Sequence, residues 1–123
     1  MIPVNQTLFG GKEGNCFEAC LASIMEVPIE IFPGYKDADW LALYNRFLGA
    51  NFGLQLLLIA GEQHQLFKVQ FGMDCHHLIS GQGPRGLKHS VVGLNGRMVH
   101  DPHPDGSGLV EVDTWDFLVR SYR

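Results

Sequence analysis

The order of helix-like and strand-like patterns along this chain constrains its fold more than any other feature of the sequence. Apolar residues in the first part recur with the helical period, whereas after residue 53 short apolar runs alternate with clusters of Gly, Pro, Asn and Ser. Helices followed by several consecutive strands are typical of a domain in which the helices pack on a mostly antiparallel sheet. The sequence therefore predicts an α+β fold.

Two helices are predicted in the first part of the chain. One covers about 15–26, where apolar positions follow the helical period, and Pro28 ends it. The second is capped by Asp37 or Asp39 and stops at Gly49, because glycine commonly closes helices.

The rest of the sequence predicts strands. A buried strand is expected over 54–60, and further strands are expected over 74–80, 89–94, 97–101 and 109–112. The pattern over 61–72 fits a helix and a strand equally well. The glycine-rich segment 80–86 is expected to be a flexible loop.

Composition excludes several classes of protein. The 123 residues fit one globular domain, 1–123, and a net charge of −4 without a Lys/Arg cluster argues against nucleic-acid binding. No apolar run is long enough to span a membrane, and the first residues lack the pattern of a signal peptide. Three cysteines, an odd number, fit free thiols in a reducing compartment. We therefore expect a cytoplasmic protein that binds neither nucleic acid nor membranes.

Cys16 is the first candidate for chemistry. It follows Gly14 and Asn15 and opens the first predicted helix. Backbone N–H groups at a helix start carry a partial positive charge, which favours a thiolate over a thiol. The thiolate is the nucleophilic form of cysteine, so this position suits a catalytic nucleophile. The alternative is a small buried hydrophobe, which is what we expect of Cys20 one turn further along.

A cysteine nucleophile needs a base, a group that orients the base, and donors for the oxyanion. His89 is the best base because it begins an apolar strand, and Asp101 is the best orienter because it ends the next strand. Gln6 is the best side-chain donor for the oxyanion, together with the backbone N–H of Cys16. Two plainer interpretations stay open: Asp101 before Pro102 can simply start a turn, and Gln6 can be a surface amide.

Two segments, QTLFGGKEGNCFEACLASI and HSVVGLNGRMVHDP, resemble the papain-like peptidases that trim double-glycine leaders from bacteriocins. The GNC and HDPHP runs are also similar to those of small bacterial and phage proteins. The resemblance implies a minimal papain-like fold, in which a nucleophile helix packs on the sheet, and it implies no cofactor. It also implies roles for the residues singled out above: Cys16 as nucleophile, His89 as base, Asp101 as orienter and Gln6 as oxyanion donor.

These features predict a thiol hydrolase that cleaves a peptide, isopeptide or other amide bond in a peptide or protein substrate. One alternative is a catalytically degenerate binding module on the same fold, for example a phage-encoded inhibitor of a host protein. Another is a zinc-bound interaction domain, since the chain has six histidines and three cysteines. The sequence holds no C-x-x-C or H-x-x-x-H pair, however, so we expect no metal.

The loop over 80–86 lies just before the candidate base. It is either a plain connector or a gate over the substrate, in which case Gln82 and Arg85 are its candidate gating residues. Trp40 and Trp115 are expected in the core rather than at a substrate site.

The turn at Asn95-Gly96 decides whether His89 and Asp101 share a face of the sheet. A two-residue turn between unbulged strands would place Ser90 opposite Asp101, so the base and its orienter would point to opposite faces. We therefore expect a three-residue loop with Gly96 left-handed, or an equivalent bulge elsewhere in the hairpin.

Overall fold

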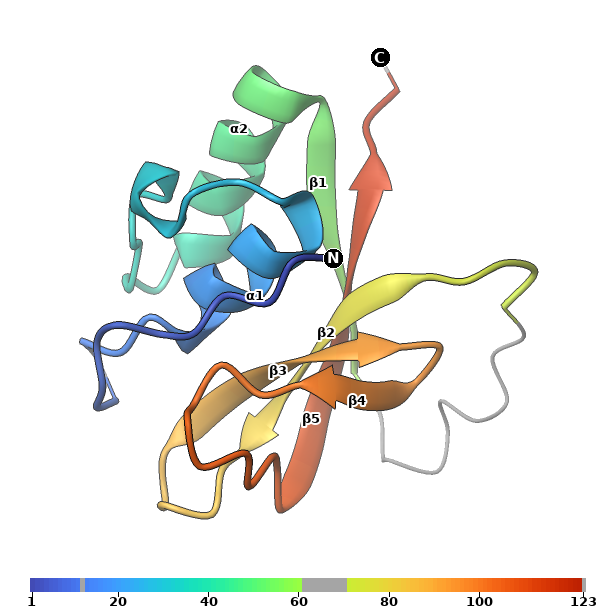
Figure 1. Cartoon of the computed structure of the whole chain (residues 1–123). Coiled ribbons are helices and arrows are strands. Elements are labelled where there is room, and N and C mark those ends of the chain that lie inside the picture. The colour runs from blue at the N-terminus through green and yellow to red at the C-terminus, as the bar shows by residue number, and fades with distance from the viewer. Residues whose placement is uncertain (12, 61–70, 123) are drawn as a thin grey trace.

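The computed structural model describes residues 1–11, 13–60 and 71–122 (Figure 1). Within these ranges two α-helices pack on a five-stranded antiparallel sheet of order β1-β5-β2-β3-β4, which confirms the expected α+β class. None of the helices described there is long and apolar enough to cross a membrane. The elements are α1 (Cys16–Met25), η1 (Ile29–Ile31), α2 (Trp40–Phe52), β1 (Leu54–Ala60), β2 (His76–Gln82), β3 (Lys88–Leu94), β4 (Arg97–His100) and β5 (Glu111–Arg120).

Helix α1 forms where the sequence predicts it, and α2 runs further than predicted. The predicted end of the second helix at Gly49 is wrong, because the helix continues to Phe52. Gly53 closes it instead, with a left-handed φ of 66° and an N–H that bonds to the carbonyls of Gly49 and Leu48. Glycine adopts this conformation without the steric penalty of a side chain, so the second glycine is the better helix end.

The strand predictions need two corrections. The predicted buried strand is β1, but it lies at the edge of the sheet, and its Leu57 and Ile59 are 50% and 42% exposed. The prediction over 109–112 misses most of β5, which runs from Glu111 to Arg120 in the middle of the sheet. Polar residues interrupt its apolar pattern and hide the strand. The ambiguous segment 61–72 lies mostly outside the described residues.

Both helices cover the same face of the sheet, α1 over β3 and α2 over β1 (Figure 1). The core between these layers includes Leu21 of α1, Leu48 of α2, Leu78 of β2 and Val92 of β3, all fully buried. Each such side chain contributes about 1.5–3 kcal/mol through removal of apolar surface from water. This packing fixes the start of α1 against β3.

The β3–β4 hairpin contains a bulge, though not at the predicted place. Asn95 and Gly96 form a two-residue turn with φ of 51° and 90°, so the predicted three-residue loop is wrong. Further along the hairpin, however, the pairing between β3 and β4 shifts by one residue. Gly93 pairs with Met98 and Val92 pairs with His100, which leaves the residue between Met98 and His100 as a bulge. The alternative form of the prediction, a bulge elsewhere in the hairpin, is therefore confirmed.

Candidate functional site

The start of α1 is held in place by the residues just before it. The side-chain carbonyl of Asn15 accepts hydrogen bonds from the backbone N–H groups of Thr7 and Leu8, both at 2.9 Å. Gly14 is required because a Cβ there would lie 2.3 Å from the carbonyl oxygen of Gly10. The GNC run thus ties the N-terminal segment to the first turn of the helix that carries Cys16.

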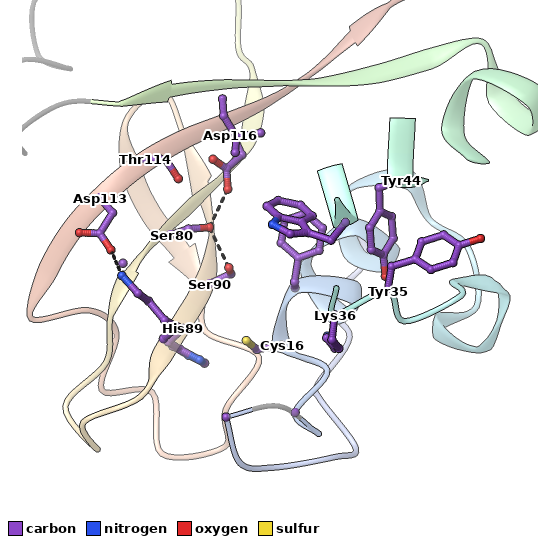
Figure 2. Close-up of a pocket in the computed structure, with 17 residues that line it drawn as sticks. Cys16, Tyr35, Lys36, Tyr44, Ser80, His89, Ser90, Asp113, Thr114 and Asp116 are labelled. Carbon is purple, nitrogen blue, oxygen red and sulfur yellow. Dashed lines mark hydrogen bonds and ion pairs between the residues drawn. The ribbon is translucent and has the colours of Figure 1, made fainter. Parts of the chain in front are cut away.

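Cys16 lines a cavity of about 500 Å³ that His89 also lines (Figure 2). Burial raises the pKa of the Cys16 thiol more than backbone hydrogen bonds with Ser90 and Phe17 lower it. Burial therefore works against the thiolate that the helix start favours, and the pKa of the thiol lies above its usual value. A base has to take the proton before the sulfur can attack.

His89 and Asp101 form a buried pair. The Nε2 atom of His89 lies 2.7 Å from Oδ1 of Asp101, and the two residues are 6% and 9% exposed. The bulge in β4 explains the contact, because continuing the register from His100 places Asp101 opposite Val91, on the same face as His89. Since Nε2 faces Asp101, Nδ1 is the ring nitrogen that can exchange a proton with another group.

Three donors hold the Asp101 carboxylate. Besides His89, the backbone N–H groups of His103 and Gly108 donate to it at 2.9 and 2.8 Å. Burial raises the pKa of Asp101, but these hydrogen bonds together lower it by more, so the net pKa lies below the usual value. The carboxylate therefore stays ionised at neutral pH and fixes the orientation of the imidazole.

The structure does not bring Gln6 to the cavity that Cys16 lines. Gln6 is buried, and its side-chain Nε2 donates to the carbonyl of Leu8 at 3.0 Å. Its backbone N–H donates to the carbonyl of Pro102 at 2.9 Å, which joins the N-terminal segment to the residue after Asp101. The oxyanion role of the Gln6 side chain stays a prediction.

The candidate gating residues lie beside the cavity rather than in its lining. Gln82 is the last residue of β2, paired with Lys88, so the predicted flexible loop begins later than expected. Arg85 forms an ion pair with Asp105 at 2.7 Å. The turn between the strands is closed by a hydrogen bond from the Gly83 N–H to the Leu87 carbonyl at 2.8 Å. A gating role for Gln82 and Arg85 stays a prediction.

The sequence reasoning missed a row of polar side chains in the same cavity. Ser80 of β2 donates to Oδ2 of Asp116 in β5 at 2.6 Å, and Ser80 and Ser90 of β3 share a hydrogen bond of 2.8 Å (Figure 2). Burial raises the pKa of Asp116 more than hydrogen bonds with Ser80 and Thr114 lower it. One signal was available, because Asp116 is an isolated acidic residue between Trp115 and Phe117.

Aromatic rings form the wall across the cavity from this polar row (Figure 2). Phe17 packs edge-to-face on Trp40 and Tyr44, with ring centroids 5.4 and 5.5 Å apart, and Tyr35 packs on Tyr44 at 5.5 Å. Trp40 packs against the main core, as predicted, and it also lines the cavity. Trp115 is 2% exposed and belongs to the smaller core on the other face, as predicted.

The other titratable residues that the structure describes do not gather into a metal site. Among the described residues no group of three or more His, Cys, Asp or Glu side chains is arranged to hold a metal ion. Cys16, Cys20 and Cys75 are free thiols, and Cys20 is fully buried in the core as predicted.

What the cavity brings together is a thiol, an imidazole and, behind the imidazole, an ionised carboxylate. Such a set can transfer a proton from sulfur to nitrogen and stabilise the resulting charge. Comparisons with protein-family models, with curated proteins and with solved structures find no match for this chain.

Proposed function

We propose that the protein is a papain-like thiol hydrolase that cleaves a peptide, isopeptide or other amide bond in a peptide or protein substrate. The observation that carries this proposal is the buried His89–Asp101 contact of 2.7 Å, at the cavity that Cys16 lines. A helix that starts with the nucleophile and packs on an antiparallel sheet bearing the base is the arrangement that the resemblance implies. Cys16 is the nucleophile, His89 the base and Asp101 the residue that orients it.

The reaction follows from the protonation states. His89 accepts the thiol proton at Nδ1, and the Cys16 sulfur attacks the carbonyl carbon of the scissile amide. The backbone N–H of Cys16 stabilises the oxyanion. The imidazolium then gives its proton to the leaving nitrogen as the C–N bond breaks, leaving a thioester. A water molecule, deprotonated by His89, hydrolyses the thioester and restores the thiol.

The ionised state of Asp101 matters most when His89 carries the positive charge. A carboxylate that accepts a hydrogen bond from an imidazolium makes a stronger bond than one that accepts from a neutral ring. The pair is buried, so water screens it little. Asp101 therefore favours proton transfer to His89 and offsets the raised pKa of the Cys16 thiol.

One observation favours the alternative of a catalytically degenerate binding module. Burial raises the pKa of Cys16, and a module that only binds has no need of a reactive thiol. On that alternative the cavity binds a protein segment, and His89 and Asp101 serve to stabilise the hairpin.

An electrophilic activity probe distinguishes the hydrolase from the binding module. We would treat the wild type, Cys16→Ala and His89→Ala with a peptide vinyl sulfone and identify the modified residue by mass spectrometry. A hydrolase should be modified at Cys16 in the wild type, and much more slowly in His89→Ala. Equal modification of the wild type and His89→Ala would favour the binding module.

A further inference from the structure

The cavity beside Cys16 contains a carboxyl group, that of Asp116, without a cationic partner among the described residues. Lys88 pairs with Asp113, and Lys36 pairs with Glu18. Asp116 is 1% exposed, and its Oδ1 has no hydrogen-bond partner among the described residues. In the part of the chain that the structure describes, the two lysines that line the cavity each pair with another carboxylate, so neither neutralises Asp116.

The strands on either side of Asp116 do not satisfy it either. Its in-register neighbours are Leu58 on β1 and Leu78 on β2, whose side chains have no polar atoms. Ser80 donates to Oδ2 alone. A buried carboxyl oxygen without a partner destabilises a fold. A buried acid with an unpartnered oxygen, at a cavity that the candidate nucleophile also lines, points to a ligand.

The rest of the cavity suits a cationic ligand with an apolar stem. Tyr35 and Tyr44 line the wall across from the Asp116–Ser80–Ser90 row (Figure 2), and Phe17 and Trp40 pack on Tyr44 and line the same cavity. Aromatic faces attract lysine and arginine head groups, and aliphatic stems pack on them. A volume of about 500 Å³ accommodates one long side chain.

We propose that Asp116 binds a lysine or arginine side chain of the substrate, close to the amide bond that Cys16 attacks, with the aromatic wall covering the stem. This inference rests on the proposed hydrolase function and adds the substrate class. The carboxyl group of Asp116 is the acceptor for the ammonium or guanidinium group, and the hydroxyl of Ser80 fixes one of its oxygens. Asp116 is a specificity-determining residue on this proposal, and the reaction itself involves Cys16 and His89.

The test uses peptide vinyl sulfones that are identical except for one residue, placed either first or second before the electrophile. That residue is arginine, lysine, norleucine or glutamate, and the second-order rate of Cys16 modification is measured for each. The wild type should react about tenfold faster with the better basic probe than with the norleucine probe, the effect of one charge-assisted hydrogen bond. Equal rates for basic and norleucine probes at both positions would overturn the proposal.

Two variants assign the preference to Asp116. Asp116→Asn should abolish the preference for basic probes, while Asp74→Asn, the same change at an exposed position near the β3–β4 turn, should keep it. A preference that survives in Asp116→Asn would contradict the proposal. Should Asp116→Asn fail to fold, Trp40→Leu decides instead, because loss of that ring should reduce the preference and an unchanged preference would refute it.

Iodoacetamide keeps this inference separable from the proposed function. It carries no side chain for Asp116 to bind, so its reaction with the wild type and with His89→Ala reports on Cys16 and His89 alone. If alkylation depends on His89 but the preference for basic probes is absent, only the specificity proposal is contradicted. If alkylation is equally fast in the wild type and in His89→Ala, the hydrolase proposal is contradicted, and this inference is contradicted with it.

Discussion

Asp101 and Asp116 are both buried aspartates near one cavity, yet their surroundings differ in almost every respect. Asp101 accepts hydrogen bonds from His89 and from two backbone N–H groups, whereas Oδ1 of Asp116 has no partner among the described residues. The pKa of Asp101 consequently lies below its usual value, and burial raises that of Asp116. For Asp101 the hydrogen bonds outweigh burial, whereas for Asp116 burial outweighs the hydrogen bonds.

The difference also separates two uses of a buried acid. Hydrogen bonds from His89 and two backbone N–H groups hold the Asp101 carboxylate, which suits a residue that keeps His89 in one orientation. Oδ1 of Asp116 has no described hydrogen-bond partner, which suits a residue whose partner arrives with the substrate. The following predictions test this difference between Asp101 and Asp116, beginning with the largest expected effect.

Asp101→Ala should be the most damaging substitution. It leaves the N–H groups of His103 and Gly108 and the ring of His89 without an acceptor, so we expect a loss of about 3 kcal/mol in the free energy of unfolding. Urea denaturation measures it. A loss below about 1 kcal/mol would mean that the hydrogen bonds to Asp101 contribute little.

Inserting one glycine between His100 and Asp101 should disconnect Asp101 from His89 without touching Asp116. The insertion places Asp101 opposite Ser90 instead of Val91, and therefore on the face opposite His89. Alkylation of Cys16 should then slow, whereas deletion of Val99, which removes the bulge but keeps Asp101 opposite Val91, should leave the rate near that of the wild type. Equal rates in the insertion variant and the deletion variant would show that the register of the hairpin does not position the pair.

Asp116→Asn should stabilise the protein at pH 7. The amide keeps the acceptor for Ser80 and removes the cost of an ionisable group in an apolar setting, so we expect a gain of about 1 kcal/mol. Urea denaturation of this variant beside Asp101→Asn, which should lose stability, measures the contrast directly. A loss of stability in both variants would make Asp116 a structural residue.

The two acids should give stability profiles of opposite slope with pH. The contribution of Asp101 is present above the unfolded pKa of about 3.9 and is lost as the pH falls through its lower folded pKa. The contribution of Asp116 is complete below about 3.9 and is lost as the pH rises through its raised folded pKa. The profile of Asp116→Asn should therefore decline less above pH 4 than that of the wild type, as read from urea midpoints.

The same contrast marks what could be predicted from the sequence. Cys16, His89 and Asp101 lie at element ends, where local signals such as a helix start and a glycine turn are strong, and the structure joins His89 to Asp101 as expected. Asp116 escaped notice because its strand is interrupted by polar residues. Its partner Ser80 is also 36 positions away, so that pairing depends on sheet order, which local patterns do not encode.

The hairpin shows a different limit. The dipeptide Asn95-Gly96 indicated a two-residue turn, and the demand that His89 meet Asp101 indicated a one-residue shift in register. The structure has both the two-residue turn and the register shift, because the shift occurs beyond the turn, after Met98. A bulge position depends on side chains from both strands and from the layers that cover them, so neither strand alone predicts it.

The most direct test of the hydrolase proposal is the rate at which iodoacetamide alkylates Cys16 at pH 7, with Cys20 and Cys75 as references in the same sample. Cys16 should react first, and His89→Ala should slow it about tenfold, which corresponds to one pKa unit. His100→Ala, which removes a histidine that bonds to the carbonyl of Val4, should leave the rate within about twofold. Faster alkylation of Cys75, or equal rates in the two histidine variants, would contradict a catalytic pair of Cys16 and His89.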